Sequence, residues 1–155
     1  MKHYLLVFCI LLAGLTSCKK TDDSAAVAAQ AAIDDAAIQA YIKANYSTTT
    51  FTKDPSGLYY AVTKTGTGAY PTAANNVSVS YTGTILNGAV FETSPSQYIP
   101  LSTSIQGWQI GLTHINDGGT IILLIPSALG YGTTVNGAVP ANSCLLFTIG
   151  LQGFN

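Results

Sequence analysis

The second half of the chain alternates hydrophobic and polar positions, a pattern that predicts a β-sheet. In the stretch 77–82, Val77, Val79 and Tyr81 alternate with serine and threonine, the period of two expected for a strand with one buried face. Other strand-like segments are bounded by residues that favour turns. We expect these strands at 58–64, 98–101, 120–125 and 144–154.

The sequence around Asn87-Gly88 predicts a β-hairpin. Both residues tolerate the positive φ that a two-residue type I′ turn requires, so the strand that begins at 77 should fold back here and continue to about Thr93. The returning strand carries Phe91 next to Glu92. Because adjacent strand residues point to opposite faces, we expect Phe91 in a core and Glu92 at its lip.

Two segments show helical spacing instead. Within 105–112, the apolar residues recur at helical intervals and predict a short helix. Residues 25–46 form an alanine-rich run without glycine or proline, which favours a longer helix with its cap among residues 22–24. This helix is weakly amphipathic and needs a surface to pack on, either the sheet or a second copy of itself. Its apolar face contains Ile38, Tyr41 and Ile42.

Together these elements predict an α+β fold. An antiparallel sheet of about five strands should curl over the short helix, and the N-terminal helix should precede the sheet. The polar, turn-rich segment 47–57 separates the two parts, so we expect one domain over 56–155.

The chain begins with features of a secreted protein. A short basic start precedes an apolar stretch at 4–12, which is shorter than the roughly 20 residues of a membrane span, so residues 1–17 are expected to be a signal peptide. The sequence at 15–18 is similar to a lipobox, in which Cys18 carries the lipid and 18–24 form a lipidated tether to the inner or outer membrane. The alternative is an ordinary signal peptide followed by a chance cysteine.

Charged residues are few and unevenly placed. After residue 17 the chain has five lysines, seven acidic residues and no arginine, a net charge of about −2. Nothing resembles the basic patch of a nucleic-acid-binding protein, so no nucleic-acid partner is expected. Beyond Lys64 the only carboxylate side chains are Glu92 and Asp117.

These few groups form no familiar catalytic or metal-binding motif. His114 is the one histidine after the leader and cannot build a zinc site, so we expect a structural role for it and no metal or cofactor. Glu92 and Asp117 could form a glycosidase-like pair, but Asp117 precedes two glycines and is better explained as a turn residue. Cys144 lies in an apolar run and is interpreted as a small buried hydrophobe rather than a reactive thiol.

The remaining aromatic residues could be an ordinary core, but their sequence context resembles the FKBP-type peptidyl-prolyl isomerases. Four motifs keep the order and spacing of that family across the domain 56–155. They contain Tyr81-Thr82-Gly83, Asn87-Gly88, Phe91-Glu92, Gln106-Gly107-Trp108, Gly130-Tyr131-Gly132, Val139-Pro140 and Leu145-Leu146-Phe147. The leader and N-terminal helix also resemble those of bacterial lipoprotein members.

The resemblance implies an FKBP-like fold and a pocket that binds proline-containing polypeptides and isomerises the Xaa–Pro bond. Trp108 would form the floor under the proline ring, and the backbone N–H of Ile105 and the hydroxyl of Tyr131 would hold substrate carbonyls. Glu92 would stand at the rim, where the family usually has aspartate. The remaining walls would come from Tyr81, Phe91, Val139 and Phe147.

Departures from the family pattern keep a second function open. Glu92 is one methylene longer than the family's aspartate, Ser104 replaces the usual valine, and Ala141 stands where a second proline often follows. The segment between Glu92 and Ile99 is short, so Tyr98 is expected to replace an aromatic wall that many members carry there.

The first hypothesis is therefore an isomerase, of full or reduced activity, that assists folding outside the cytoplasm. The second is a module that binds proline segments or unfolded chains with little turnover, and a distant third is an adhesion lipoprotein. We expect a monomer or weak dimer.

The resemblance also indicates which strand residues face outward, and some of these are apolar. It places Ile122, Leu124 and Leu146 on the outer face of the sheet, where an apolar surface needs a cover. We expect the N-terminal helix to pack there, away from Trp108.

Overall fold

The computed structural model describes residues 20–86 and 88–155. The long helix is α1 (Lys20–Asn45) and the short one is α2 (Gln106–Gly111). The strands are β1 (Thr52–Lys53), β2 (Tyr59–Lys64), β3 (Asn76–Ile85), β4 (Val90–Pro100), β5 (Thr120–Ile125) and β6 (Leu145–Phe154). Three short 3₁₀ turns, η1 (Leu101–Thr103), η2 (Leu112–His114) and η3 (Ser127–Leu129), complete the regular structure of these residues.

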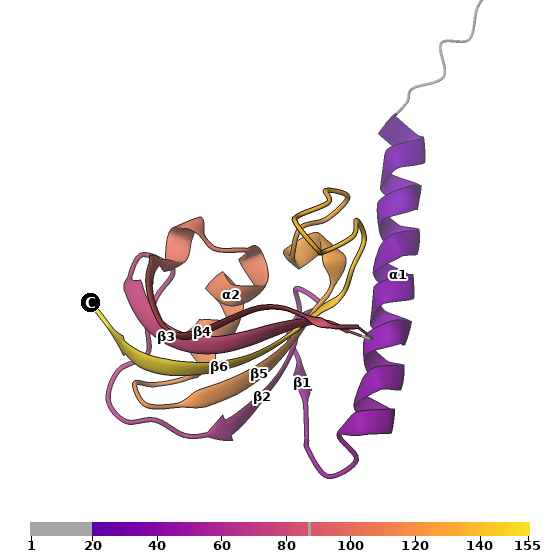
Figure 1. The fold of residues 1–155 in the computed structure, drawn as a ribbon. Helices are drawn as coiled ribbons and strands as arrows, with labels where there is room; N and C mark the ends of the chain where they lie inside the picture. Colours follow the sequence, from indigo (N-terminus) through magenta and orange to yellow (C-terminus); the bar gives the residue numbers. More distant parts are fainter. Residues whose placement is uncertain (1–19, 87) are drawn as a thin grey trace, which may run out of the picture.

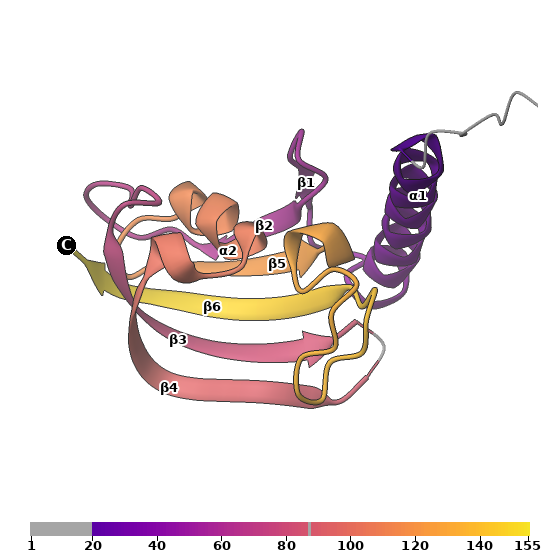
Figure 2. The same cartoon turned by 90° about the horizontal axis from the view of Figure 1, so that it is seen from above.

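The described strands form a single antiparallel sheet in the order β1-β2-β5-β6-β3-β4 (Figure 2). The α+β class and the curved sheet with α2 against one face are therefore confirmed (Figure 1). The sheet gains a sixth strand because two residues, Thr52 and Lys53, pair with β2. The strand expected separately at 98–101 is the end of β4, which pairs with β3 along its whole length.

The alternation along β3 places one face of the sheet in the core, as expected. Val77, Val79 and Tyr81 are buried, whereas Ser78 and Ser80 are only partly covered. The core lies between this inner face and α2, and includes Leu112, which is fully buried. Burial of this apolar surface is the main favourable contribution to folding.

Two glycines allow α2 to lie directly on β5. A Cβ at Gly107 would lie 2.6 Å from Ile125 Cγ2, and one at Gly111 would lie 2.6 Å from Leu123 Cδ1. Because the two positions are four residues apart, they share one face of the helix. Any larger side chain there would push α2, and with it Trp108, away from the sheet.

The β3–β4 hairpin forms, but its turn differs from the expected two-residue one. The Gly88 N–H donates to the carbonyl of Ile85, and the Ile85 N–H donates to the carbonyl of Ala89, so the loop spans 86–88. Asn87 lies outside the described residues. The strand pairing also shifts twice, between Val79 and Tyr81 and between Gly83 and Thr84, and each shift inserts one extra residue into β4.

The N-terminal helix begins earlier than the sequence indicated. Residues 20–24, expected to be tether and cap, belong to α1, which ends one residue before the expected 46. The expected signal peptide at 1–17 and the expected lipidation site Cys18 lie outside the described residues. No helix within the described ranges is long and apolar enough to cross a membrane.

Helix α1 packs against one end of the outer face of the sheet (Figure 1), as expected. Ile38 is fully buried in a small cluster with Leu124, and Tyr41, Ile42 and Leu146 are packed against it. Ile122 is buried but does not belong to this cluster, so the helix covers less of the outer face than the sequence implied. The cluster fixes α1 away from Trp108.

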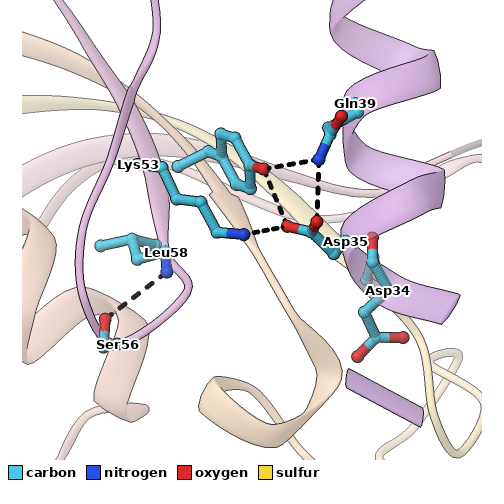
Figure 3. Close-up of polar contacts among 8 residues, drawn as sticks. Asp34, Asp35, Gln39, Lys53, Ser56 and Leu58 are labelled. Atoms are coloured by element: carbon cyan, nitrogen blue, oxygen red, sulfur yellow. Dashed lines mark hydrogen bonds and ion pairs between the residues drawn. The ribbon is translucent and has the colours of Figure 1, made fainter. Parts of the chain in front are cut away.

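Polar contacts reinforce the position of α1 (Figure 3). The Asp35 carboxylate accepts hydrogen bonds from the Lys53 ammonium and from the Tyr59 hydroxyl, the latter at 2.8 Å, and Gln39 Nε2 donates to its second oxygen at 2.8 Å. These bonds join the middle of the helix to β1 and β2. Lys53 above all, and then Tyr59, hold the pKa of Asp35 below its ordinary value.

Candidate active site

A cleft of about 220 Å³ opens between the inner face of the sheet, α2 and the loop that precedes β6. Most of its lining is apolar or aromatic, and Glu92 is its only charged side chain. Nine residues line it, namely Tyr81, Glu92, Ile99, Thr103, Ser104, Ile105, Trp108, Tyr131 and Phe147. Six of these were expected from the sequence, and Ser104 was noted as a departure from the family pattern at the site. Ile99 and Thr103 were not named as site residues.

Edge-to-face aromatic contacts hold the floor and walls of the cleft. The Trp108 ring lies 4.9 Å from the Tyr81 ring and 5.2 Å from the Phe147 ring, with interplanar angles of 81° and 87°. Such geometry is preferred because the positive edge of one ring meets the negative face of the other. Trp108 and Phe147 are 5% and 2% exposed, so the floor is almost completely buried.

Phe91 supports the cleft from behind rather than lining it. Its ring packs edge-to-face on Phe147 at 5.6 Å, and both rings lie over Gly83. A Cβ at Gly83 would lie 2.6 Å from Phe147 Cε1 and 2.9 Å from Phe91 Cζ, so the close approach depends on glycine. Val139 is likewise buried in the core and does not line the cleft.

Phe91 packs into the core and Glu92 lies at the cleft, as expected, but the expectation that they point to opposite faces of the sheet is wrong. The β-bulge opposite Gly83 and Thr84 inserts Phe91 into β4 as the extra residue, because Gly83 pairs with Glu92 while Thr84 pairs with Val90. Strict alternation is lost at this point. Phe91 therefore packs into the core, and Glu92 lines the cleft on the same side of the sheet.

Tyr98 lies outside the cleft, contrary to its expected role as a wall. It is 60% exposed and donates a hydrogen bond to Asn155 Oδ1 at 2.9 Å. The β-bulge opposite Val79 and Tyr81 reverses which β4 side chains face the cleft, because Val79 pairs with Gln97 while Tyr81 pairs with Ser94. Ile99 faces the cleft in place of Tyr98, and nothing in the sequence pattern marks the bulge that causes this exchange.

The Tyr81 hydroxyl connects the aromatic floor to the polar rim. It lies 2.7 Å from Glu92 Oε1 and 2.8 Å from Gln97 Oε1, each of which can accept its proton. Burial, followed by the hydrogen bond and charge of Glu92, raises the pKa of Tyr81 strongly. The longer side chain of glutamate thus still reaches a defined partner, which fixes its carboxylate at the rim.

Tyr131 closes the opposite side of the cleft from the loop after η3. Burial first, and then the negative charge of Glu92, raise the pKa of Tyr131, so its hydroxyl stays protonated at neutral pH. On the neighbouring wall, Ile105 precedes α2 with φ −58° and ψ 149°, and its carbonyl accepts a hydrogen bond from the backbone N–H of Trp108 at 3.0 Å. The cleft therefore combines apolar walls with hydroxyl groups and one carboxylate.

The remaining reactive residues have structural surroundings. His114 stacks on Tyr60 with ring centroids 4.1 Å apart, and Asp117 lies in a turn before Gly118, whose φ is +77°. Cys144 is buried beside α1, and burial above all raises the pKa of its thiol to about 12. Within the described part of the chain, no group of three histidine, cysteine or acidic residues could hold a metal ion.

Comparison with known proteins identifies the family. A sequence model of the FKBP-type peptidyl-prolyl cis-trans isomerases matches residues 68–152, which include all nine residues that line the cleft. The chain belongs to this family. FKBP-type relatives include FkpA of Aeromonas hydrophila, 38% identical over 116 residues, which cover 72% of this chain and 43% of that protein. The outer membrane protein MIP of Legionella longbeachae is 36% identical over 117 residues, covering 72% of this chain and 50% of that protein.

Two solved structures show the same fold. The crystal structure of FkpA from Escherichia coli superposes with a TM-score of 0.71 and 32% identity, covering 88% of this chain and 66% of that one. A peptidyl-prolyl isomerase from Pseudomonas syringae superposes with a TM-score of 0.69 at 23% identity, over 92% of this chain and 99% of that one. The chain spans about two fifths of the length of the curated FkpA relatives that it matches.

Proposed function

We propose that this FKBP-type chain is a peptidyl-prolyl cis-trans isomerase that assists protein folding outside the cytoplasm. The observation that carries the proposal is the aromatic cleft over Trp108, which is open to solvent and has a volume of about 220 Å³. Family membership supports the same activity.

The reaction requires no nucleophile and no metal. Rotation about a peptide bond crosses a barrier of about 18–20 kcal/mol because the twisted amide loses resonance. The twisted amide has less charge separation than the planar one, so a cleft with apolar walls binds it better than water does. Trp108, Tyr81 and Phe147 would thus accelerate the reaction by binding the transition state more tightly than the ground state.

Polar groups at the edge of the cleft would orient the peptide. The backbone N–H of Ile105 and the hydroxyl of Tyr131 would each donate to a substrate carbonyl, which fixes the chain on both sides of the proline. The carboxylate of Glu92 would stand beside the rotating amide, held by its hydrogen bond with Tyr81. Correct placement matters, since an error of 1 Å can cost about 100-fold in rate.

A protease-coupled isomerisation assay on an Ala-Leu-Pro-Phe peptide tests the proposal. The unmodified chain should accelerate cis-to-trans conversion, and Trp108→Ala should reduce kcat/KM by about 100-fold because the floor under the proline ring is lost. Glu92→Asp, which restores the family's usual residue, should keep or increase the rate. Val62→Ala, at an exposed position of β2, serves as the control.

The same assay separates the enzyme from a proline-binding or holdase module. Glu92 and Ser104 both line the cleft and both depart from the family pattern, which is why the second function deserves a test. If the folded chain suppresses aggregation of an unfolded protein but gives no acceleration, the isomerase proposal is wrong and the binding function replaces it.

The proposal includes a location in the cell envelope. The apolar leader, the lipobox-like sequence at 15–18 and the similarity to a protein named as an outer membrane protein support it. Lipid attachment at Cys18 would tether the isomerase to a membrane. Replacing Cys18 by alanine should move the protein from the membrane fraction to the soluble fraction, and an unchanged distribution would contradict the tether.

A further inference from the structure

Helix α1 places a carboxylate inside the protein at its contact with the isomerase domain. Asp34 is 2% exposed and lies one residue before Asp35, yet the two side chains point in different directions (Figure 3). A buried carboxylate is costly unless hydrogen bonds replace its lost hydration. Asp34 therefore needs specific partners in the folded domain.

Those partners are two donors of Ser127 and one of Gln30. The Ser127 N–H and hydroxyl both donate to Asp34 Oδ2, at 2.8 and 2.6 Å, and Gln30 Nε2 donates to Oδ1 at 2.7 Å. Ser127 is itself 2% exposed and begins η3. Charge-assisted hydrogen bonds of this kind are among the stronger ones in proteins.

Ser127 in turn holds the backbone on both sides of Tyr131. Its carbonyl accepts the N–H of Gly130 at 3.0 Å and the N–H of Gly132 at 2.8 Å. The Gly132 carbonyl then accepts the Asn142 N–H at 2.8 Å, which closes the loop toward β6. A continuous set of hydrogen bonds thus runs from Asp34 through Ser127 to the two neighbours of Tyr131.

We propose that Asp34 is a positioning residue for catalysis, because through Ser127 it fixes the backbone that places Tyr131 at the cleft. This inference rests on the proposed isomerase function. Asp34 lies outside the segment 68–152 that matches the family, so α1 contributes to the active site from outside that segment. The helix is therefore part of the catalytic unit rather than only a spacer.

A double-mutant cycle in the full chain tests the proposal. Tyr131→Phe should lower kcat/KM about fivefold to tenfold, because one substrate hydrogen bond is lost. Asp34→Ala should lower it about threefold to tenfold in the unmodified chain, but by less than about twofold in the Tyr131→Phe chain, since its effect acts through that hydroxyl. Asp34→Asn keeps an oxygen that can accept from Ser127 and should retain more activity than Asp34→Ala.

Asp35→Asn is the matched control. It removes a charge from the adjacent position of the same helix, but the contacts of Asp35 lead to Lys53 and Tyr59 and not to η3. The control should weaken the attachment of α1 and leave kcat/KM within about twofold, the spread expected of independent sites. An equal loss in the Asp34 and Asp35 variants would mean that any loosening of α1 lowers activity, and the proposal would be overturned.

Amide hydrogen exchange gives a readout that does not depend on activity. Asp34→Ala should speed exchange at Gly130 and Gly132 relative to the core strands, because their shared acceptor on Ser127 is no longer fixed. Unchanged exchange at Gly130 and Gly132 would refute the proposal. An equal loss of kcat/KM on Asp34→Ala in the unmodified and the Tyr131→Phe chains would also refute it. An unmodified chain without isomerase activity would instead refute the proposed function, and the exchange experiment would still decide whether Asp34 orders this loop.

Discussion

At the scale of single residues, the cleft depends as much on an absent side chain as on the aromatic rings. Gly83 sits on β3 beneath both Phe91 and Phe147, and no other residue leaves room for the two rings. The glycine therefore determines how far Phe147 can advance toward Trp108, and with it the shape of the wall.

Gly83→Ala should destabilise the fold by about 1–3 kcal/mol, because the added methyl overlaps two packed rings. It should also lower the affinity for a proline peptide by moving Phe147. Gly150→Ala is the control, since its Cβ would lie 2.9 Å from Ser80 Oγ, the end of a short side chain that can rotate away, and 4.0 Å from Thr120 Oγ1. Urea unfolding and peptide titration measure both effects; equal stability of the two variants would show that Phe91 and Phe147 yield without cost.

The sequence predicted most of the lining residues, but it did not predict which residues of β4 face the cleft. Tyr81, Trp108, Tyr131 and Phe147 could be named because their motifs keep a fixed spacing. Tyr98 was assigned wrongly and Ile99 was passed over, because an extra residue in β4 reverses the alternation after Ser94. Bulges are set by the pairing with β3, which one strand's pattern does not contain.

At the scale of elements, α1 is attached through one side only. Ile38 is fully buried against the outer face of the sheet, while Ile33, five residues earlier, is 62% exposed. The alanine-rich composition predicted the helix and its apolar face correctly. It did not predict the start at Lys20, because polar residues at 20–24 serve equally well as helix or as cap, and it gave no sign that Asp34 is buried.

The two isoleucines provide a matched test of this attachment. Ile38→Ala should destabilise the chain by about 2–5 kcal/mol, because a fully buried side chain is replaced by a cavity. Ile33→Ala should change stability by less than about 0.5 kcal/mol, as is usual for an exposed position. Chemical denaturation followed by circular dichroism distinguishes them, and a similar small effect of both would mean that α1 is not held by this cluster.

At the scale of the whole molecule, the polar attachment of α1 depends on pH. Asp35 has a pKa below its ordinary value of 3.8, above all because Lys53 hydrogen-bonds to it. A carboxylate whose pKa is lowered by folding stabilises the folded state above its ordinary pKa, and this contribution is lost as the pH falls through the lowered pKa. The attachment should therefore persist at neutral pH and weaken only in acid.

Asp35→Asn should accordingly be less stable than the unmodified chain at pH 7, and the difference should disappear as the pH falls below 3.8. Asp54, whose pKa is also lowered, is present in both chains, so its contribution cancels in the comparison. Urea titrations at a series of pH values measure the difference. A constant difference from pH 7 to strong acid would show that ionisation of Asp35 does not contribute.

The burial of Trp108 under the cleft has an optical consequence. It is the only tryptophan in the chain, so the emission excited at long ultraviolet wavelengths comes from one indole, and that indole forms the floor of the cleft. A peptide that enters displaces solvent from above this ring and changes its emission. Trp108 is thus an intrinsic fluorescent probe in the cleft, and peptide binding to the cleft can be followed in solution without an added dye.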